Sequence, residues 1–156
     1  AIRRQRQMCI RDRSKKDTFA TNAKNVINAV RTSMASGDVK NGSEECSYPA
    51  DGSAVKITIT SDALKGLLER GGDKSSFGRA YNDSYVIIYN KGGDKFDYYI
   101  AITDKGGNGV DTFTKESALT GSNIKLGNAG NITGTFKPDG SENALATSNI
   151  STCTVS

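Results

Sequence analysis

A single apolar stripe near the N-terminus constrains this chain more than any other feature. Six apolar side chains recur at the three- and four-residue spacing of one helical face: Phe19, Ala23, Val26, Ile27, Val30 and Met34. Polar side chains occupy the opposite face, and Gly37 ends the pattern. Because the stripe is narrow, the helix needs another layer to cover it. The spacing therefore predicts a helix over residues 14–36 that packs against the rest of the chain.

The chain then changes to the two-residue period of β-strands. Residues 54–60 alternate apolar and polar side chains, as a half-buried strand does. Residues 61–71 have the pattern of a short capped helix. Residues 84–90 and 95–104 are aromatic and β-branched runs joined by a short glycine-containing connection, which predicts a hairpin.

Weaker strand patterns complete the sequence at residues 124–126, 132–136 and 150–155. The order of these elements predicts an α+β fold. In that fold the long N-terminal helix, residues 14–36, packs on an antiparallel β-sheet formed within residues 54–156, and a short second helix accompanies it.

The excess positive charge is confined to the N-terminus. The first 16 residues hold seven basic side chains and one acidic side chain, whereas the rest of the chain is slightly acidic. Residues 7–13 also resemble translated linker sequence. We therefore predict a foreign or disordered basic leader over residues 1–13, followed by one domain over residues 14–156. The alternative is a basic arm that binds nucleic acid or anionic lipid. The slight negative charge of the remaining domain argues against a nucleic-acid partner.

The absence of histidine limits the chemistry of this chain. It excludes the Ser-His-Asp triad, the Cys-His pair and the common zinc sites. No pair of acidic residues has helical or strand spacing within a predicted apolar pocket, which argues against general acid–base catalysis. No stretch approaches the roughly 18 consecutive apolar residues of a membrane span. We therefore expect no enzyme activity, no cofactor, no catalytic residue and no metal site.

Two other patterns each allow two interpretations. Residues 104–111 place acidic and amide oxygens around a glycine, as a calcium loop does. Gly106 and Lys115 occupy two of the ligand positions of that motif, which favours a plain turn. Five tyrosines form either a stacking platform for sugar or single-stranded nucleic acid or, more often, part of the core and cross-strand pairs of a sheet. They are Tyr81, Tyr85, Tyr89, Tyr98 and Tyr99.

Several short motifs follow one another along the chain. They include Ser14-Lys15-Lys16, Asn22-Ala23-Lys24 and Ala29-Val30, and later Ser75-Ser76-Phe77-Gly78, Tyr98-Tyr99-Ile100 and Gly109-Val110. Their order and spacing resemble type IV pilins, most closely those of Gram-positive bacteria, over roughly residues 14–127. In those pilins a Ser-Pro-Phe-Gly turn leads into the sheet of the globular head. Here Ser76 replaces the proline of that turn.

The resemblance implies a structural subunit of a type IV pilus-like extracellular filament. Such a subunit acts by polymerisation, in adhesion, motility or surface attachment. Its implied partners are further copies of itself and the pilus assembly machinery. Its implied location is the bacterial cell surface, after a stage in which an apolar helix anchors it in the membrane. The alternatives are a pseudopilin of a type II-like secretion apparatus and a stand-alone extracellular adhesin or glycan-binding module.

Some functional features of pilins have no counterpart in this sequence. The family has a prepilin-peptidase site, an early glutamate, and an apolar helix half that forms the membrane anchor and later the filament core. None of these is present, so their roles transfer to no residue here. Contact with a membrane is implied only through a missing N-terminal helix.

The cysteines are the remaining candidates for a site. Cys9 lies in the predicted leader, which leaves Cys46 and Cys153. Many pilins tie down their C-terminal region with one disulfide, so the resemblance implies a Cys46–Cys153 bridge, worth roughly 2–4 kcal/mol in an oxidising compartment. Two unpaired thiols are the alternative, and the polar surroundings of Cys46 favour the bridge.

Overall fold

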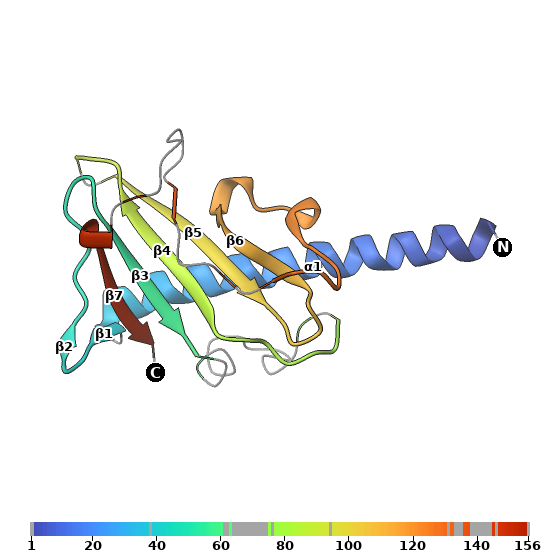
Figure 1. The fold of residues 1–156 in the computed structure, drawn as a ribbon, viewed down its shortest axis with the longest axis horizontal. Coiled ribbons are helices and arrows are strands. Elements are labelled where there is room, and N and C mark those ends of the chain that lie inside the picture. Colours follow the sequence, from blue (N-terminus) through green and yellow to red (C-terminus); the bar gives the residue numbers. More distant parts are fainter. Residues whose placement is uncertain are drawn as a thin grey trace.

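One long α-helix and a seven-stranded sheet make up the ordered framework (Figure 1). The computed structural model describes residues 2–37, 39–60, 63, 75, 77–93, 95–130, 132, 136–137, 145 and 147–155, with the backbone alone for residues 2–12. The elements are α1 (Ile2–Ser36), β1 (Val39–Asn41), β2 (Glu44–Glu45), β3 (Ala54–Ile59), β4 (Ser84–Asn90), β5 (Phe96–Thr103), β6 (Gly109–Lys115), the 3-10 helices η1 (Glu116–Ala118), η2 (Gly121–Asn123) and η3 (Thr147–Asn149), and β7 (Ile150–Val155).

Helix α1 passes behind the sheet and extends well beyond its edge toward the N-terminus (Figure 1). Its helical backbone begins at Ile2 and so includes the residues that the sequence analysis assigned to a basic leader. Gly37 has a φ of 79°, the left-handed conformation with which helices commonly end. No helix within the described part of the chain combines the length and the apolarity that crossing a membrane requires.

The sheet is mixed, with the strand order β2-β1-β7-β3-β4-β5-β6. The C-terminal strand β7 pairs with β3 in parallel, from Ala54 opposite Ile150 to Ile59 opposite Val155. The other neighbouring strands pair antiparallel. The hairpin predicted at residues 84–104 is formed by β4 and β5.

The predicted fold class is wrong: the described residues form one long α-helix packed with a seven-stranded mixed sheet, in which β7 pairs with β3 in parallel, rather than a helix on an antiparallel sheet. A hairpin turn sets the directions of only its own two strands, so the hairpin at residues 84–104 does not determine how the other strands pair. No short turn connects β7 to β3, and the long connection between them allows parallel pairing. Residues 61–71 of the predicted second helix lie outside the described residues except for Ala63.

The sheet buries side chains on both of its faces. The face toward α1 carries the larger core, which includes Ile57, Val86, Ile88, Ile100 and Ile102. The opposite face carries a smaller cluster formed by Ala54, Ile87, Tyr99 and Phe136. Strands β3, β4 and β5 are therefore covered on both faces and form the centre of the fold, on which the C-terminal part of α1 packs.

Candidate functional site

Helix α1 lies on the sheet through one continuous apolar face. The structure buries all six side chains of the stripe, and Phe19, Ala23, Val26, Ile27 and Val30 have no exposed surface. All six belong to the same cluster as the inward-facing side chains of the sheet. Burying a large aliphatic or aromatic side chain contributes about 1.5–3 kcal/mol. The seat of the helix, defined as these six residues, therefore holds α1 firmly against the sheet.

Aromatic contacts surround Phe19 at the N-terminal end of this seat. Its ring centroid lies 5.8 Å from that of Tyr81 and 6.0 Å from that of Phe77. Gly109, with a φ of 132°, passes so close that a Cβ there would lie 2.9 Å from the Phe19 ring. Glycine is thus required at this position both by conformation and by space. The packing fixes the direction in which α1 leaves the domain.

The 3-10 helix η2 borders α1 just beyond Phe19. A Cβ on Gly121 would collide with the carboxylate of Asp17, so the two backbones approach closely. Thr120 and Asn123 form a capping box that fixes this turn. A groove of about 490 Å³ lies next to the contact, and the exposed Leu126 forms part of its wall.

A polar contact joins the C-terminal half of α1 to η1, which directly follows the edge strand β6, and to Tyr98 in β5. The Arg31 guanidinium donates to the carboxylate of Glu116 in η1 and lies 4.2 Å from the ring centroid of Tyr98. Burial raises the pKa of the Tyr98 hydroxyl, the nearby Tyr48 hydroxyl raises it further, and Arg31 opposes both effects. The cation–π contact and the ion pair orient α1 about its axis in a way that apolar packing alone does not.

A disulfide joins Cys46 and Cys153, whose Cα atoms lie 6.2 Å apart and whose positions differ by 107 residues. Cys153 lies within β7, whereas Cys46 directly follows β2. The bond therefore links the last strand of the chain to the segment that follows the long helix. It is the bridge that the pilin resemblance implied.

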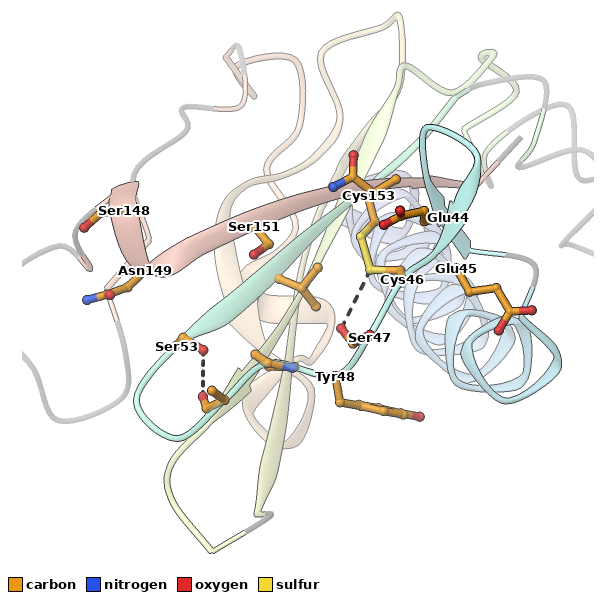
Figure 2. Close-up of a pocket in the computed structure, with 14 residues that line it drawn as sticks. Glu44, Glu45, Cys46, Ser47, Tyr48, Ser53, Ser148, Asn149, Ser151 and Cys153 are labelled. Atoms are coloured by element: carbon orange, nitrogen blue, oxygen red, sulfur yellow. Dashed lines mark hydrogen bonds between the residues drawn. A yellow bond between two sulfur atoms is a disulfide. The ribbon is translucent and has the colours of Figure 1, made fainter.

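A polar pocket of about 410 Å³ lies beside this disulfide (Figure 2). Glu44 and Glu45 supply its carboxylates, and serine hydroxyls from the segment before β3 and from the β7 end complete much of its wall. The Tyr48 side chain is 44% exposed, and its ring centroid lies 4.9 Å from that of Phe96. Among the described residues that line the pocket there is no arginine or lysine, so the charge that these side chains contribute is negative.

Residues 104–111, for which the sequence favours a plain turn over a calcium loop, are built around the buried carboxylate of Asp104, which is 1% exposed. It accepts hydrogen bonds from the Ser75 hydroxyl at 2.6 Å and from the backbone N–H groups of Gly106 at 2.8 Å and Asn108 at 3.0 Å. These donors occupy the carboxylate oxygens, which favours the plain turn over a cation site. The described residues contain no cluster of three acidic or thiol ligands placed to hold a metal ion.

The five tyrosines do not form one platform, because the structure places them on different faces. Tyr81 and Tyr98 lie on the α1 side of the sheet, against Phe19 and Arg31. Tyr89 and Tyr99 pack against Phe136 on the opposite face, with ring centroids 5.8 Å and 4.7 Å away. The Lys56 ammonium lies 4.5 Å from the ring centroid of Tyr85, elsewhere on that opposite face.

A further carboxylate, Asp111 in β6, anchors the segment that follows η2. It accepts a hydrogen bond from the Gly130 N–H at 2.9 Å, and the Lys125 ammonium lies 2.9 Å from its other oxygen. Burial by itself would raise the pKa of Asp111, but the Gly130 hydrogen bond and the Lys125 charge outweigh it and lower the pKa below its ordinary value.

The lowered pKa of Asp111 predicts a loss of stability in acid. Because the folded state holds the carboxylate ionised more strongly than the unfolded state, its contribution is complete above about pH 4 and is lost as the pH falls further. We expect Asp111→Asn to lower the urea unfolding midpoint at neutral pH, and the difference from the parent chain to shrink in acid. Asp51→Asn, at an exposed carboxylate, is the control. A difference that stays constant down to acid pH would contradict the prediction.

Sequence reasoning missed the contact residues that orient the helix, Arg31 and Glu116, and the buried acceptor Asp104. Arg31 lies on the polar side of the predicted helix, where arginine is ordinarily exposed. A lone aspartate at the end of a strand signals a turn and gives no indication of burial. The one available signal was the alternation of residues 95–104, which places Asp104 at the end of a buried strand.

Two features of the described residues are thus candidates for function: α1 with its seat and its N-terminal extension, and the pocket beside the disulfide. Both depend on packing and covalent cross-linking rather than on reactive side chains brought together. The chain matches no protein-family model, no curated protein and no solved structure.

Proposed function

We propose that this chain is a structural subunit of a type IV pilus-like extracellular filament that acts by polymerisation. The observation that carries the proposal is the arrangement of α1. Its apolar face is fixed under the sheet from Phe19 to Met34, and the helix then extends beyond the sheet toward the N-terminus (Figure 1). A helix fixed in this way can join a bundle with other helices while the sheet remains on the outside.

The contacts of α1 suit a subunit that transmits force. The ring contacts of Phe19 fix the helix at one end of its seat, and the Arg31–Glu116 ion pair fixes it near the other. Pulling on the N-terminal part of the helix would therefore move the sheet with it as one body. The disulfide supports the same role, because cross-links persist in extracellular proteins.

The partners proposed for this subunit are further copies of the chain and the machinery that assembles them at the bacterial surface. A membrane anchor before assembly belongs to the same proposal. The glycan-binding alternative would be favoured by an exposed row of tyrosines, but these side chains are divided between the two faces of the sheet. We therefore prefer the filament subunit to the adhesin.

Sequencing the gene upstream of the Ser14 codon tests this proposal directly. In the native gene we expect the predicted foreign leader, residues 1–13, whose backbone continues α1 here, to be replaced by a cleavage site followed by about 20 apolar residues with an early glutamate, the length that a membrane-spanning helix needs. Electron microscopy of the source cells, labelled with antibodies raised against this domain, should then show labelled surface filaments. An ordinary secretory signal peptide directly before the domain would contradict the proposal. Label without long filaments would favour a pseudopilin.

A further inference from the structure

The C-terminal strand β7 occupies an interior position in the sheet. It lies between β1, with which it pairs antiparallel, and β3, with which it pairs in parallel over six residues. No pairing joins β1 directly to β3 in the described sheet. Without β7, a gap of one strand would therefore separate the β1–β2 hairpin from the remaining four strands.

Side chains as well as backbone groups hold β7 in this gap. Cys153 and Val155 are 4% and 5% exposed and belong to the core that faces α1. Two features of the gap therefore select the strand that fills it. The backbones of β1 and β3 offer hydrogen bonds on both edges, and the core accepts apolar side chains at alternate positions of the strand. The segment that fits best is a β7 strand with this sequence.

The connection to β7 is long enough for the strand to reach a second molecule. Phe136 is packed on the outer face of the sheet, and β7 begins at Ile150. The 13 intervening residues can span about 45 Å when extended, once Leu145 gives up the hydrogen bond that its backbone N–H donates to the Phe136 carbonyl. A copy that kept Phe136 in place could therefore present its β7 strand to a neighbouring copy.

We propose that β7 is exchanged between two copies of this chain, each filling the gap between β1 and β3 of the other. The Cys46–Cys153 disulfide then decides which chain keeps the strand, because Cys153 lies within β7 and Cys46 belongs to the acceptor side of the gap. A bond formed within one chain retains β7, whereas a bond formed between chains makes the exchange permanent. This inference does not depend on the proposed function.

The exchanged and unexchanged forms are close in free energy because the contacts of β7 are the same in both. The exchanged and unexchanged forms contain the same strand pairs and the same disulfide, so their balance depends mainly on protein concentration and on the strain of the connection. The choice is made during folding, before the thiols are oxidised. In the oxidation step two thiols form one disulfide, and one molecule of oxidised glutathione is reduced to two glutathione thiols.

Two complementary variants test the exchange in the full-length chain. One carries Cys9→Ser and Cys46→Ser and retains only Cys153. The other carries Cys9→Ser and Cys153→Ser and retains only Cys46. Neither chain can form the bridge alone, so any Cys46–Cys153 disulfide must join two chains. The two are unfolded together in urea, refolded together at several concentrations with oxidised glutathione, and analysed by non-reducing electrophoresis and peptide mass spectrometry.

We expect a covalent dimer joined by Cys46 and Cys153 whose yield rises with concentration, and loss of this dimer when either variant is refolded alone. Mixing the two after separate refolding should give far slower dimer formation, because β7 must first leave the sheet. Absence of the dimer from the co-refolded sample would overturn the proposal. So would equal dimer yields in the single-variant controls, because these would indicate random oxidation of exposed thiols.

A second measurement covers the case in which the serine variants fold poorly. The Cys9→Ser chain, with both remaining cysteines intact, is prepared in light and heavy isotopic forms. The two forms are refolded together under reducing conditions and then oxidised. Exchange predicts Cys46–Cys153 peptides that join a light chain to a heavy chain, within the dimer fraction. If this disulfide joins only peptides of the same isotopic form at every concentration, β7 is not exchanged.

Discussion

Reduction of the Cys46–Cys153 disulfide is expected to lower the free energy of unfolding by about 2–5 kcal/mol. The bond connects residues that are 107 positions apart, so reducing it releases a large closed loop in the unfolded chain. In this chain the loop extends from the segment after β2 to the middle of β7 and therefore includes strands β3 to β6. The unfolded state gains most of the freedom that the bond had removed, whereas the folded state loses only one covalent link.

Urea unfolding of the oxidised and reduced chain measures this effect. For a domain of this size the loss corresponds to a melting temperature lower by on the order of 10 °C. Both samples should carry Cys9→Ser, so that Cys9 takes no part in oxidation. Reduced parent chain is the better comparison than a double serine variant, because the sulfur atom of the buried Cys153 stays in the core. Equal unfolding midpoints in the two redox states would contradict the prediction.

Replacing Asp104 by asparagine is expected to cost about 1.5–3 kcal/mol, the value of hydrogen bonds to a charged group. The carboxylate is almost fully buried, and the Ser75 hydroxyl and two backbone N–H groups point at it. Asparagine keeps the shape but replaces one acceptor oxygen with an NH₂ donor. The side-chain NH₂ of Asn108, which lies 3.2 Å from both carboxylate oxygens, then faces another donor, and the remaining hydrogen bonds lose their charge assistance.

The control for Asp104→Asn is the same substitution at Asp51, which is exposed. That variant should change stability by no more than about 0.5 kcal/mol, as surface substitutions usually do. Ser75→Ala removes a single donor from Asp104 and should have an effect between the two. Equal urea midpoints for Asp104→Asn and Asp51→Asn would show that the buried hydrogen bonds contribute no net stability.

Local patterns predicted the elements whose hydrophobic residues repeat regularly. The stripe from Phe19 to Met34 specifies both a helix and the face that it buries. The alternating residues 54–60 and the hairpin at 84–104 correspond to β3, β4 and β5, which contain the longest regular runs. In these elements the period of the side chains and the geometry of the backbone agree, so the neighbouring sequence is sufficient.

Other elements have no such local pattern. Strands β1 and β2 are two or three residues long, and β6 begins at Gly109 with a polar run that resembles a loop. These segments are strands because neighbouring backbones offer hydrogen-bond partners and not because of their own side chains. Similarly, the direction of β7 follows from its path back to β3, which no residue within β7 encodes.

The residues of the candidate site also fall into two groups, those that the sequence identified and those whose roles only the structure revealed. The sequence identified the seat of α1 from its spacing, and the pilin resemblance suggested the cysteine pair. The Arg31–Glu116 ion pair and the buried Asp104 depend on residues far apart in the chain, and the polar character of these side chains predicted exposure. Their roles became visible only with the positions of their partners.

By itself, the sequence determined which segments repeat as helix or strand and which face of each is apolar, because those properties depend on neighbours a few positions away. It also limited the chemistry, since a chain without histidine lacks the residue on which many catalytic and zinc sites depend. Only the tertiary structure decided that the sheet is mixed, that β7 lies inside it, and that one aspartate is buried among donors. Those outcomes depend on which distant segments compete for the same strand edge and the same core, and that competition is resolved only when the whole chain packs.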